Sequence, residues 1–152
     1  MIELSETDKA YIAGLFDGEG CICLTKLKTR SKHGGISPEY HLIANITNTY
    51  LSVLEWIQMI FRGNLNLKLD PKSTKPGYRL EFSTRQAVDF LSTIQPYLKI
   101  KLDQCHVALQ YIKWFDSLPS YKGKRCGIPE EILIKKEEFK TKIQMLNKGA
   151  MA

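Results

Sequence analysis

The sequence predicts an α+β fold in which helices flank two β-hairpins in the order αββαββα, followed by further C-terminal helices. Three observations predict it. Apolar and polar residues alternate in four segments, as in half-buried strands, and turn-rich stretches join these segments in pairs. Elsewhere apolar residues recur at helical spacing. We expect a single domain over residues 1–152, with its core at about 5–118 and a C-terminal helical extension at about 119–149.

The first predicted helix begins at about Thr7, with Ser5 or Thr7 as its N-cap. An interior glycine costs about 1 kcal/mol relative to alanine, so Gly14 and Gly18 indicate close approach of another backbone; Gly18 can also simply end the helix. Glu19 follows the last turn, where unpaired carbonyl groups already carry partial negative charge. A cation makes that position favourable, and Mg²⁺ or Ca²⁺ prefers carboxylate and carbonyl ligands. The sequence therefore predicts a divalent metal at Glu19.

The predicted strands form two pairs, 21–30 with 40–48 and 64–69 with 78–83. In each strand, alternate residues are expected to face the core. The residues predicted to face inward are Ile22, Leu24, Leu42, Ala44, Ile46, Leu65, Leu67, Leu69, Tyr78, Leu80 and Phe82.

Further helices are expected at 51–61, from a capping box at 83–86 through Ile94, at 102–118, and from Pro129 to Gly149. Pro96 prevents the second of these from continuing. The apolar stripe of the last helix indicates that it packs onto the body of the protein.

Composition favours an intracellular protein with an anionic partner. The 22 basic and 16 acidic residues give a net charge of +6, and nucleic acid is the commonest partner of such a chain. The four cysteines contain no CxxC pair, so we expect reduced thiols and no zinc site. No apolar run approaches membrane-spanning length, and we expect neither a signal peptide nor a membrane partner.

The segment Ile12-Ala-Gly-Leu-Phe-Asp-Gly-Glu-Gly20 resembles the signature of the LAGLIDADG homing endonucleases at all nine positions. Residues 95–104 resemble the family's second recognisable segment, so the resemblance covers most of residues 5–118. It implies a saddle-shaped, four-stranded antiparallel sheet with helices on one face. Because the signature occurs once here, it also implies a homodimer, which brings two acids together for the two strands of a duplex. The expected dimer interface comprises Tyr11, Ala13, Gly14, Phe16 and Asp17.

The resemblance assigns catalysis to three residues. Glu19 matches the catalytic acid and, with the Gly18 carbonyl, is expected to hold Mg²⁺; Mn²⁺ is expected to substitute, and Ca²⁺ to bind without supporting cleavage. Lys101 matches the lysine near the scissile phosphate, with Lys99 as the neighbouring possibility. Asn48 matches a water-positioning amide, and a role as N-cap of the following helix is equally open.

The outward face of the strand at 40–48 is polar but hardly charged, which is typical of a surface that reads base edges. For the outward strand residues as a set, a solvated sheet face is the plainer alternative. Contacts with DNA are expected from Thr25, His41, Asn45, Thr47, Asn64, Asn66, Lys68, Arg79, Glu81 and Ser83. Contacts with phosphates are expected from Lys26, Lys28, Arg30 and Lys32. In a homodimer we expect a continuous positive saddle, with a formal charge of 2 × (+6) = +12.

The sequence thus predicts a homodimeric, Mg²⁺-dependent, intron-encoded endonuclease that recognises a long, nearly palindromic site in double-stranded DNA and cleaves both strands. The alternative is a binding protein of the same fold, either an RNA maturase or a DNA-binding protein that does not cleave. RNA is an expected partner only for a maturase. Glu19 and Lys101 favour the enzyme, because a protein that only binds needs neither.

Overall fold

The computed structural model describes residues 3–30, 36–68, 71–72, 76–119 and 128–149. Its elements are α1 (Glu6–Glu19), β1 (Gly20–Arg30), β2 (Ile36–Asn48), α2 (Leu51–Phe61), β3 (Asn64–Lys68), β4 (Gly77–Ser83), α3 (Arg85–Ile94), the 3₁₀ helix η1 (Gln95–Tyr97), α4 (Leu102–Ser117) and α5 (Glu130–Asn147). The predicted α+β fold and its αββαββα order are therefore confirmed.

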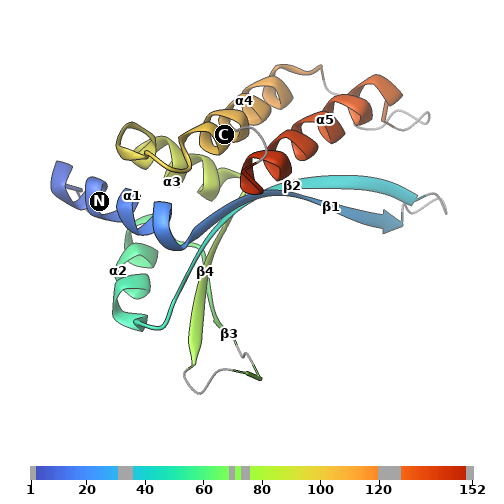
Figure 1. The fold of residues 1–152 in the computed structure, drawn as a ribbon. Coiled ribbons are helices and arrows are strands. Elements are labelled where there is room, and N and C mark those ends of the chain that lie inside the picture. The colour runs from blue at the N-terminus through green and yellow to red at the C-terminus, as the bar shows by residue number, and fades with distance from the viewer. Residues whose placement is uncertain (1–2, 31–35, 69–70, 73–75, 120–127, 150–152) are drawn as a thin grey trace.

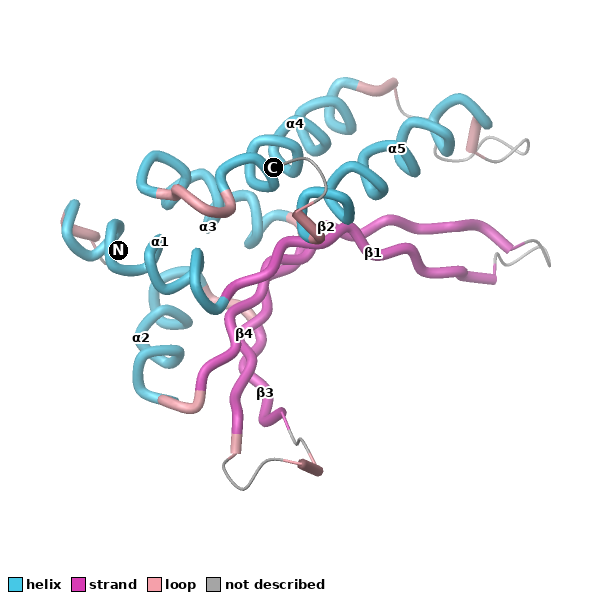
Figure 2. Tube along the Cα trace, viewed as in Figure 1, coloured by secondary structure: helices cyan, strands magenta, loops and turns pink. Residues whose placement is uncertain are grey.

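The four strands form one antiparallel sheet in the order β1-β2-β4-β3. The hairpins β1–β2 and β3–β4 meet at the central β2–β4 pair and splay apart from it (Figure 1). The helices lie on one side of the sheet, and in the described part of the chain no helix covers the concave side between the hairpins (Figure 2). The expected saddle-shaped sheet with helices on one face is confirmed.

The core lies between the sheet and the helices. Its sheet side is formed by Ile22, Leu24, Leu42, Ala44, Ile46, Leu80 and Phe82, all buried as predicted. The ring of Phe90 on α3 is stacked on Phe82 of β4, with their centroids 4.5 Å apart. It also meets Phe16 of α1 edge-on at 5.3 Å and Phe61 of α2 at 5.1 Å. A single aromatic side chain thus joins three helices to the sheet, at the spacing where aromatic pairs attract.

Two local expectations were wrong. Leu67 was predicted to face the core, but it is 53% exposed, because the β3–β4 hairpin extends past the helices that cover the rest of the sheet (Figure 1). The capping box at 83–86 is absent: Thr84 precedes α3 with φ of 43° and makes no side-chain cap. Its N–H donates instead to the carbonyl of Leu42 at 2.8 Å. The prediction for Leu69 lies outside the described residues.

Helix α5 packs onto the body, as its apolar stripe predicted. Ile143 is fully buried, and the side-chain amide of Asn147 donates to the carbonyl of Ile22 at 2.8 Å. None of the described helices combines the length and the apolar character that crossing a membrane requires. Cys21, Cys23 and Cys105 are free thiols, and Cys126 lies outside the described residues.

Candidate functional site

Helix α1 is set in place at both ends by its own sequence. Ser5 is the N-cap: its hydroxyl accepts the N–H of Asp8 at 3.1 Å, and the Asp8 carboxylate accepts the N–H of Ser5 at 3.3 Å, which is a capping box. At the other end, the Gly20 N–H donates to the Phe16 carbonyl. A Cβ at Gly20 would lie 2.5 Å from that oxygen, so only glycine lets α1 run directly into β1. Glu19, the last helical residue, is thereby fixed at the junction and is exposed.

Lys101 lies at the same end of α1. Its ammonium group donates a hydrogen bond to the carbonyl oxygen of Asp17 at 2.6 Å. The backbone N–H groups of Lys99 and Lys101 donate to the two carboxylate oxygens of Asp17, each at 2.9 Å. The electrostatic argument for a cation at this helix end is therefore met by the Lys101 ammonium, and by itself it does not require a metal.

Asn48 is the last residue of β2. Because Ile46 pairs with Gly20, Asn48 lies at the end of the sheet where α1 enters. Its side-chain oxygen accepts the N–H of Tyr50 at 2.8 Å. The N-cap of α2 is Tyr50, without a side-chain cap, so the alternative role of Asn48 as N-cap was wrong: Asn48 forms the preceding turn. Its role in positioning water stays a prediction.

The polar strand residues share one side of the sheet, because directly paired residues in an antiparallel sheet point the same way. The rows across the strands are Asn64–Glu81–Asn45–Cys21, Asn66–Arg79–Thr47, Ser83–Ile43–Cys23 and His41–Thr25. Together with Lys68 we call this surface the open sheet face. The first row ends at Cys21, which is two residues after Glu19 in the chain. The common orientation of these residues is as predicted, and their contacts with DNA stay predictions.

Two features of the open sheet face were not expected. The Nε of Arg79 is buried and has no hydrogen-bond partner among the described residues. The pKa of the Cys21 thiol is lowered to about 6, chiefly by a hydrogen bond with the Cys23 thiol and further by the positive charges of Lys101 and Arg79. The hydrogen bond with Cys21 and burial raise the pKa of Cys23. Lys101 and Arg79 therefore both act electrostatically on the start of β1.

Lys26 lies on the opposite side of the sheet from its neighbour Thr25. Its ammonium group is 3.4 Å from the carboxylate of Glu137 on α5 and 5.6 Å from the ring centroid of Tyr40. Alternation along β1 gives Lys28 the same orientation. Both are therefore turned to the helix side, and their predicted phosphate contacts do not belong to the open sheet face. The side chain of Arg30, and Lys32 as a whole, lie outside what the structure describes.

The described side chains of the open sheet face carry balanced charge. The positive charges of Lys68 and Arg79 are balanced there by the negative charges of Glu81 and of Glu39. Glu39 adjoins this face, because it lies on the same side of β2 as His41, and its carboxylate is 3.3 Å from the His41 ring nitrogen. The expected positive saddle is therefore not formed by these side chains. The polarity of the face comes mainly from amides and hydroxyls, which suit hydrogen bonding to bases better than attraction to phosphates.

The dimer-interface prediction was partly wrong. Ala13 and Phe16 are fully buried in the chain's own core, and Asp17 is 8% exposed. The solvent side of α1 includes a stripe at helical spacing, the exposed α1 stripe, formed by Ala10, Tyr11, Gly14 and Gly18. Apart from the backbone of α1 itself, a Cβ added at either glycine would meet no atom of the described residues within 4 Å. The chain's own packing therefore does not require glycine at these two positions.

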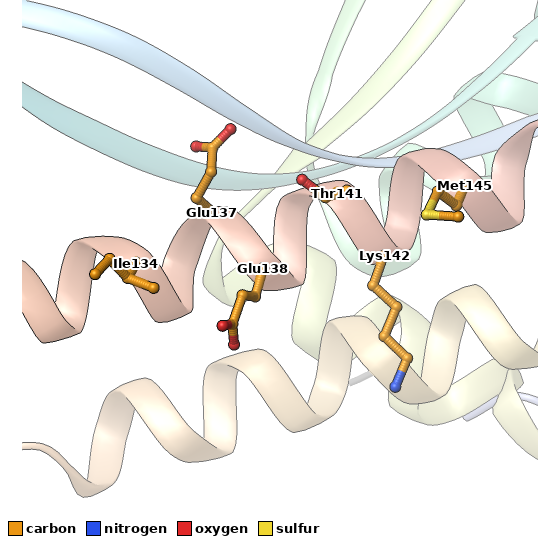
Figure 3. Close-up of a pocket in the computed structure, with 6 residues that line it drawn as sticks. All are labelled: Ile134, Glu137, Glu138, Thr141, Lys142 and Met145. Atoms are coloured by element: carbon orange, nitrogen blue, oxygen red, sulfur yellow. The ribbon is translucent and has the colours of Figure 1, made fainter.

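One chain alone offers little for a metal. Among the described residues no group of three or more His, Cys, Asp or Glu side chains could hold an ion. A hollow of about 530 Å³ lies along α5, lined by Ile134, Glu137, Glu138, Thr141, Lys142 and Met145 (Figure 3). It contains none of the predicted site residues, and all of its lining comes from α5. The chemistry-bearing groups remain those at the end of α1.

The sequence matches a family model described as LAGLIDADG endonuclease over residues 12–116, which is more than half of the chain. No curated protein sequence is similar enough to this chain to count as a match.

Several solved structures share the fold. The homing endonuclease I-CvuI, in complex with uncleaved DNA in the presence of 2 mM Mg, has a TM-score of 0.69 and 20% identity, over 93% of this chain and 82% of that chain. The archaeal intron-encoded homing endonuclease I-Vdi141I, complexed with DNA, has a TM-score of 0.66 and 15% identity, over 93% of this chain and 84% of that chain. The homing endonuclease I-TnaI has a TM-score of 0.66 and 19% identity, over 97% of this chain and 96% of that chain.

Proposed function

The chain belongs to the LAGLIDADG endonuclease family, and from this premise we propose that it is a homodimeric, site-specific DNA endonuclease. It recognises a long, nearly palindromic duplex and hydrolyses one phosphodiester bond in each strand with the help of divalent metal ions. Its gene belongs to an intron. I-CvuI and I-Vdi141I, whose structures contain DNA, support the substrate class.

The observation that carries the proposal is that Glu19 and Lys101 lie at the same end of α1. Glu19 is exposed at the junction with β1, and the Lys101 ammonium is held 2.6 Å from the Asp17 carbonyl, two residues before Glu19. An acid and a cation next to a polar binding surface are what phosphodiester hydrolysis needs. The acid helps to orient and deprotonate water, and the cation stabilises the charge that develops on the phosphate.

The exposed α1 stripe supports the dimer. Gly14 and Gly18 lower helix propensity by about 1 kcal/mol each relative to alanine, and no described residue outside the backbone of α1 would contact a Cβ at either position. A second copy of α1 packed along the stripe accounts for both residues, because small residues let two helix backbones come close. Two-fold symmetry then brings the two Glu19 carboxylates to adjacent helix ends, one for each DNA strand.

In a homodimer, the oxygen ligands at the C-terminal ends of the two α1 helices suit a divalent ion such as Mg²⁺. Glu19 supplies a carboxylate and the Gly18 carbonyl a second oxygen, the ligand types that Mg²⁺, Mn²⁺ and Ca²⁺ accept, whereas the described residues of one chain hold no cluster of their own. When bound, such an ion lowers the pKa of water and offsets charge on the phosphate. I-CvuI has been solved with DNA in the presence of Mg and of Ca.

The open sheet face supports recognition of bases. Arg79 lies between Thr47 and Asn66 in its row. Arginine pairs with two acceptors of guanine in the major groove, and asparagine pairs with adenine in the same way.

The test begins with selection, from a random duplex library, of the sites that the wild-type protein binds, and the later incubations contain Mg²⁺. The selected duplex is then incubated with the wild-type protein, with Glu19→Gln, and with the control variant Glu55→Gln, which changes an exposed acid on α2. We expect wild type and Glu55→Gln to cut both strands. Glu19→Gln should bind the duplex with similar affinity and leave it intact, because a glutamine cannot act as a base.

Other outcomes separate the alternatives. If wild type and Glu19→Gln bind the same duplex and neither cuts it with Mg²⁺ or Mn²⁺, the protein is a DNA-binding protein and nuclease activity is rejected. Binding of intron RNA in preference to any duplex, with faster splicing on addition of the protein, would identify a maturase. Monomeric protein on the duplex would reject the dimer.

A further inference from the structure

We propose that Asp17 is a positioning residue whose carboxylate holds the backbone on both sides of Ile100 and thereby fixes the Lys101 ammonium beside Glu19. The consequence for cleavage rests on the proposed nuclease function, in which Lys101 acts at the scissile phosphate. The holding contacts themselves are independent of that function. They tie the end of α1 to the segment before α4, more than 80 residues later in the chain.

The contacts use every strong acceptor of Asp17. One carboxylate oxygen accepts the Lys99 N–H and the other accepts the Lys101 N–H, each at 2.9 Å, while the backbone carbonyl accepts the Lys101 ammonium at 2.6 Å. We call these three bonds the Asp17 clamp. Asp17 is only 8% exposed, and no ion pair of the described residues involves its carboxylate. Hydrogen bonds from the backbone therefore compensate its burial, and bonds to a charged group are stronger than those between neutral groups.

In the Asp17 clamp, each charged group also lies at the helix end of opposite partial charge. Lys101 is the N-cap of α4, so the Asp17 carboxylate lies near the positive end of that helix. The Lys101 ammonium in turn lies on a carbonyl of the last turn of α1, at the negative end. Each charge is favoured by the dipole of the helix that it meets. This reciprocal arrangement restricts a long, flexible lysine side chain to one place.

Residues 99–101 have little else to hold them. They lie between η1 and α4, outside any helix or strand. The flanking bonds are Leu98 N–H to the Gln95 carbonyl and Cys105 N–H to the Lys101 carbonyl, and neither uses the N–H groups of residues 99 or 101. Without the Asp17 carboxylate these two donors lose their acceptors and the segment is free to shift. A misplacement of about 1 Å at a reacting centre can lower a rate about 100-fold.

The test replaces Asp17 by asparagine, which has the same shape but one fewer acceptor oxygen. The matched control is Asp103→Asn, an exposed aspartate in the first turn of α4. On the selected duplex at saturating protein, we expect the single-turnover cleavage rate of Asp17→Asn to fall about 100-fold. Its affinity for the duplex should change less than about threefold, since the open sheet face is untouched. Asp103→Asn should resemble wild type in both measurements.

A second comparison separates positioning from general structural support. Lys101→Met keeps the backbone N–H and removes the ammonium group. If Asp17 acts through Lys101, the double variant Asp17→Asn/Lys101→Met cuts no more slowly than Lys101→Met alone, because residues that act as a unit are not additive. Multiplicative losses in the double variant, or a fall in affinity parallel to the fall in rate, would overturn the proposal. So would wild-type cleavage by Asp17→Asn.

Amide hydrogen exchange tests the clamp without any substrate. In the wild type we expect slow exchange at residues 99 and 101 and fast exchange at Ile100, for whose N–H the described residues show no acceptor. Because asparagine keeps one acceptor oxygen, protection should be lost at one or both of residues 99 and 101 in Asp17→Asn and kept at both in Asp103→Asn. If Asp17→Asn does not fold, Asp17→Ser replaces it, and equal exchange at all three wild-type amides overturns the clamp. If wild type cuts no duplex, the proposed function fails while exchange still decides whether the clamp exists.

Discussion

The hydroxyl of Tyr40 donates a 2.6 Å hydrogen bond to the carboxylate of Glu137, which ties β2 to α5. The same carboxylate oxygen lies 3.4 Å from the Lys26 ammonium of β1, and Figure 3 shows Glu137 pointing from α5 towards these strands. The C-terminal helix is therefore joined to both strands of the first hairpin on the side opposite the open sheet face. Its contribution is to brace that hairpin.

Replacing Tyr40 by phenylalanine should lower the free energy of unfolding by about 1 kcal/mol, because it removes a hydrogen bond to a charged but partly exposed group. Urea denaturation should show a lower midpoint with an unchanged slope. Tyr50→Phe is the matched control, since Tyr50 is 68% exposed, and should leave the midpoint where it is. An unchanged midpoint in Tyr40→Phe would mean that the bond does not brace α5.

The pH dependence of this brace has a definite sign. The hydrogen bond from Tyr40, followed by the bond and the charge of Lys26, holds the pKa of Glu137 below its ordinary value of 4.5. A carboxyl group with a lowered pKa in the folded state stabilises the protein above its unfolded pKa, and this stabilisation is lost as the pH falls through the folded value. Glu137→Gln should therefore be less stable than wild type near pH 7, and the difference should shrink as the pH falls through the lowered pKa of Glu137. Urea titrations over a series of pH values, with Glu138→Gln as control, test this; a difference that grows in acid contradicts it.

Gly14 offers a test in which folding and dimerisation change in opposite directions. A Cβ at this position meets no described residue beyond the backbone of α1, so Gly14→Ala should stabilise α1 itself by up to about 1 kcal/mol. The same methyl group stands on the exposed α1 stripe and should weaken association; Gly14→Leu should abolish it. Sedimentation equilibrium with the thermal midpoint of dilute protein measures both effects. Gln110→Leu, at an exposed position of α4, is the control, and a Gly14→Leu dimer of wild-type affinity would exclude α1 as the interface.

The arrangement of strands and helices is predictable from sequence because alternation and helical spacing are local patterns. Ile22, Leu42 and Phe82 each point inward as their patterns require. Leu67 follows the same pattern and is exposed, since alternation gives orientation but not the extent of the helical cover. Lys26 was assigned to phosphates from its charge, although alternation alone already placed it opposite Thr25.

The candidate site was predictable in its residues but not in its connections. The signature indicated Glu19, and the second segment indicated Lys101. That Asp17 joins them depends on contacts between parts of the chain far apart in sequence, which no local pattern encodes. One signal was available: Asp17 lies four residues after Ala13, on the helical face that the core covers, and an aspartate on such a face must find hydrogen-bond donors.

Arg79 should determine base preference rather than overall affinity for DNA. It lies between Thr47 and Asn66 on the open sheet face, so Arg79→Lys, which keeps the charge and removes the planar fork, should weaken binding of the selected duplex by about 1–3 kcal/mol. Because two copies act symmetrically, reselection with this variant should relax one base pair in each half-site, and binding of random duplex should stay unchanged. Lys113→Gln, which removes an exposed charge on α4, should alter neither. An equal loss on selected and random duplex would instead assign Arg79 to the phosphates, since phosphate contacts carry no sequence preference.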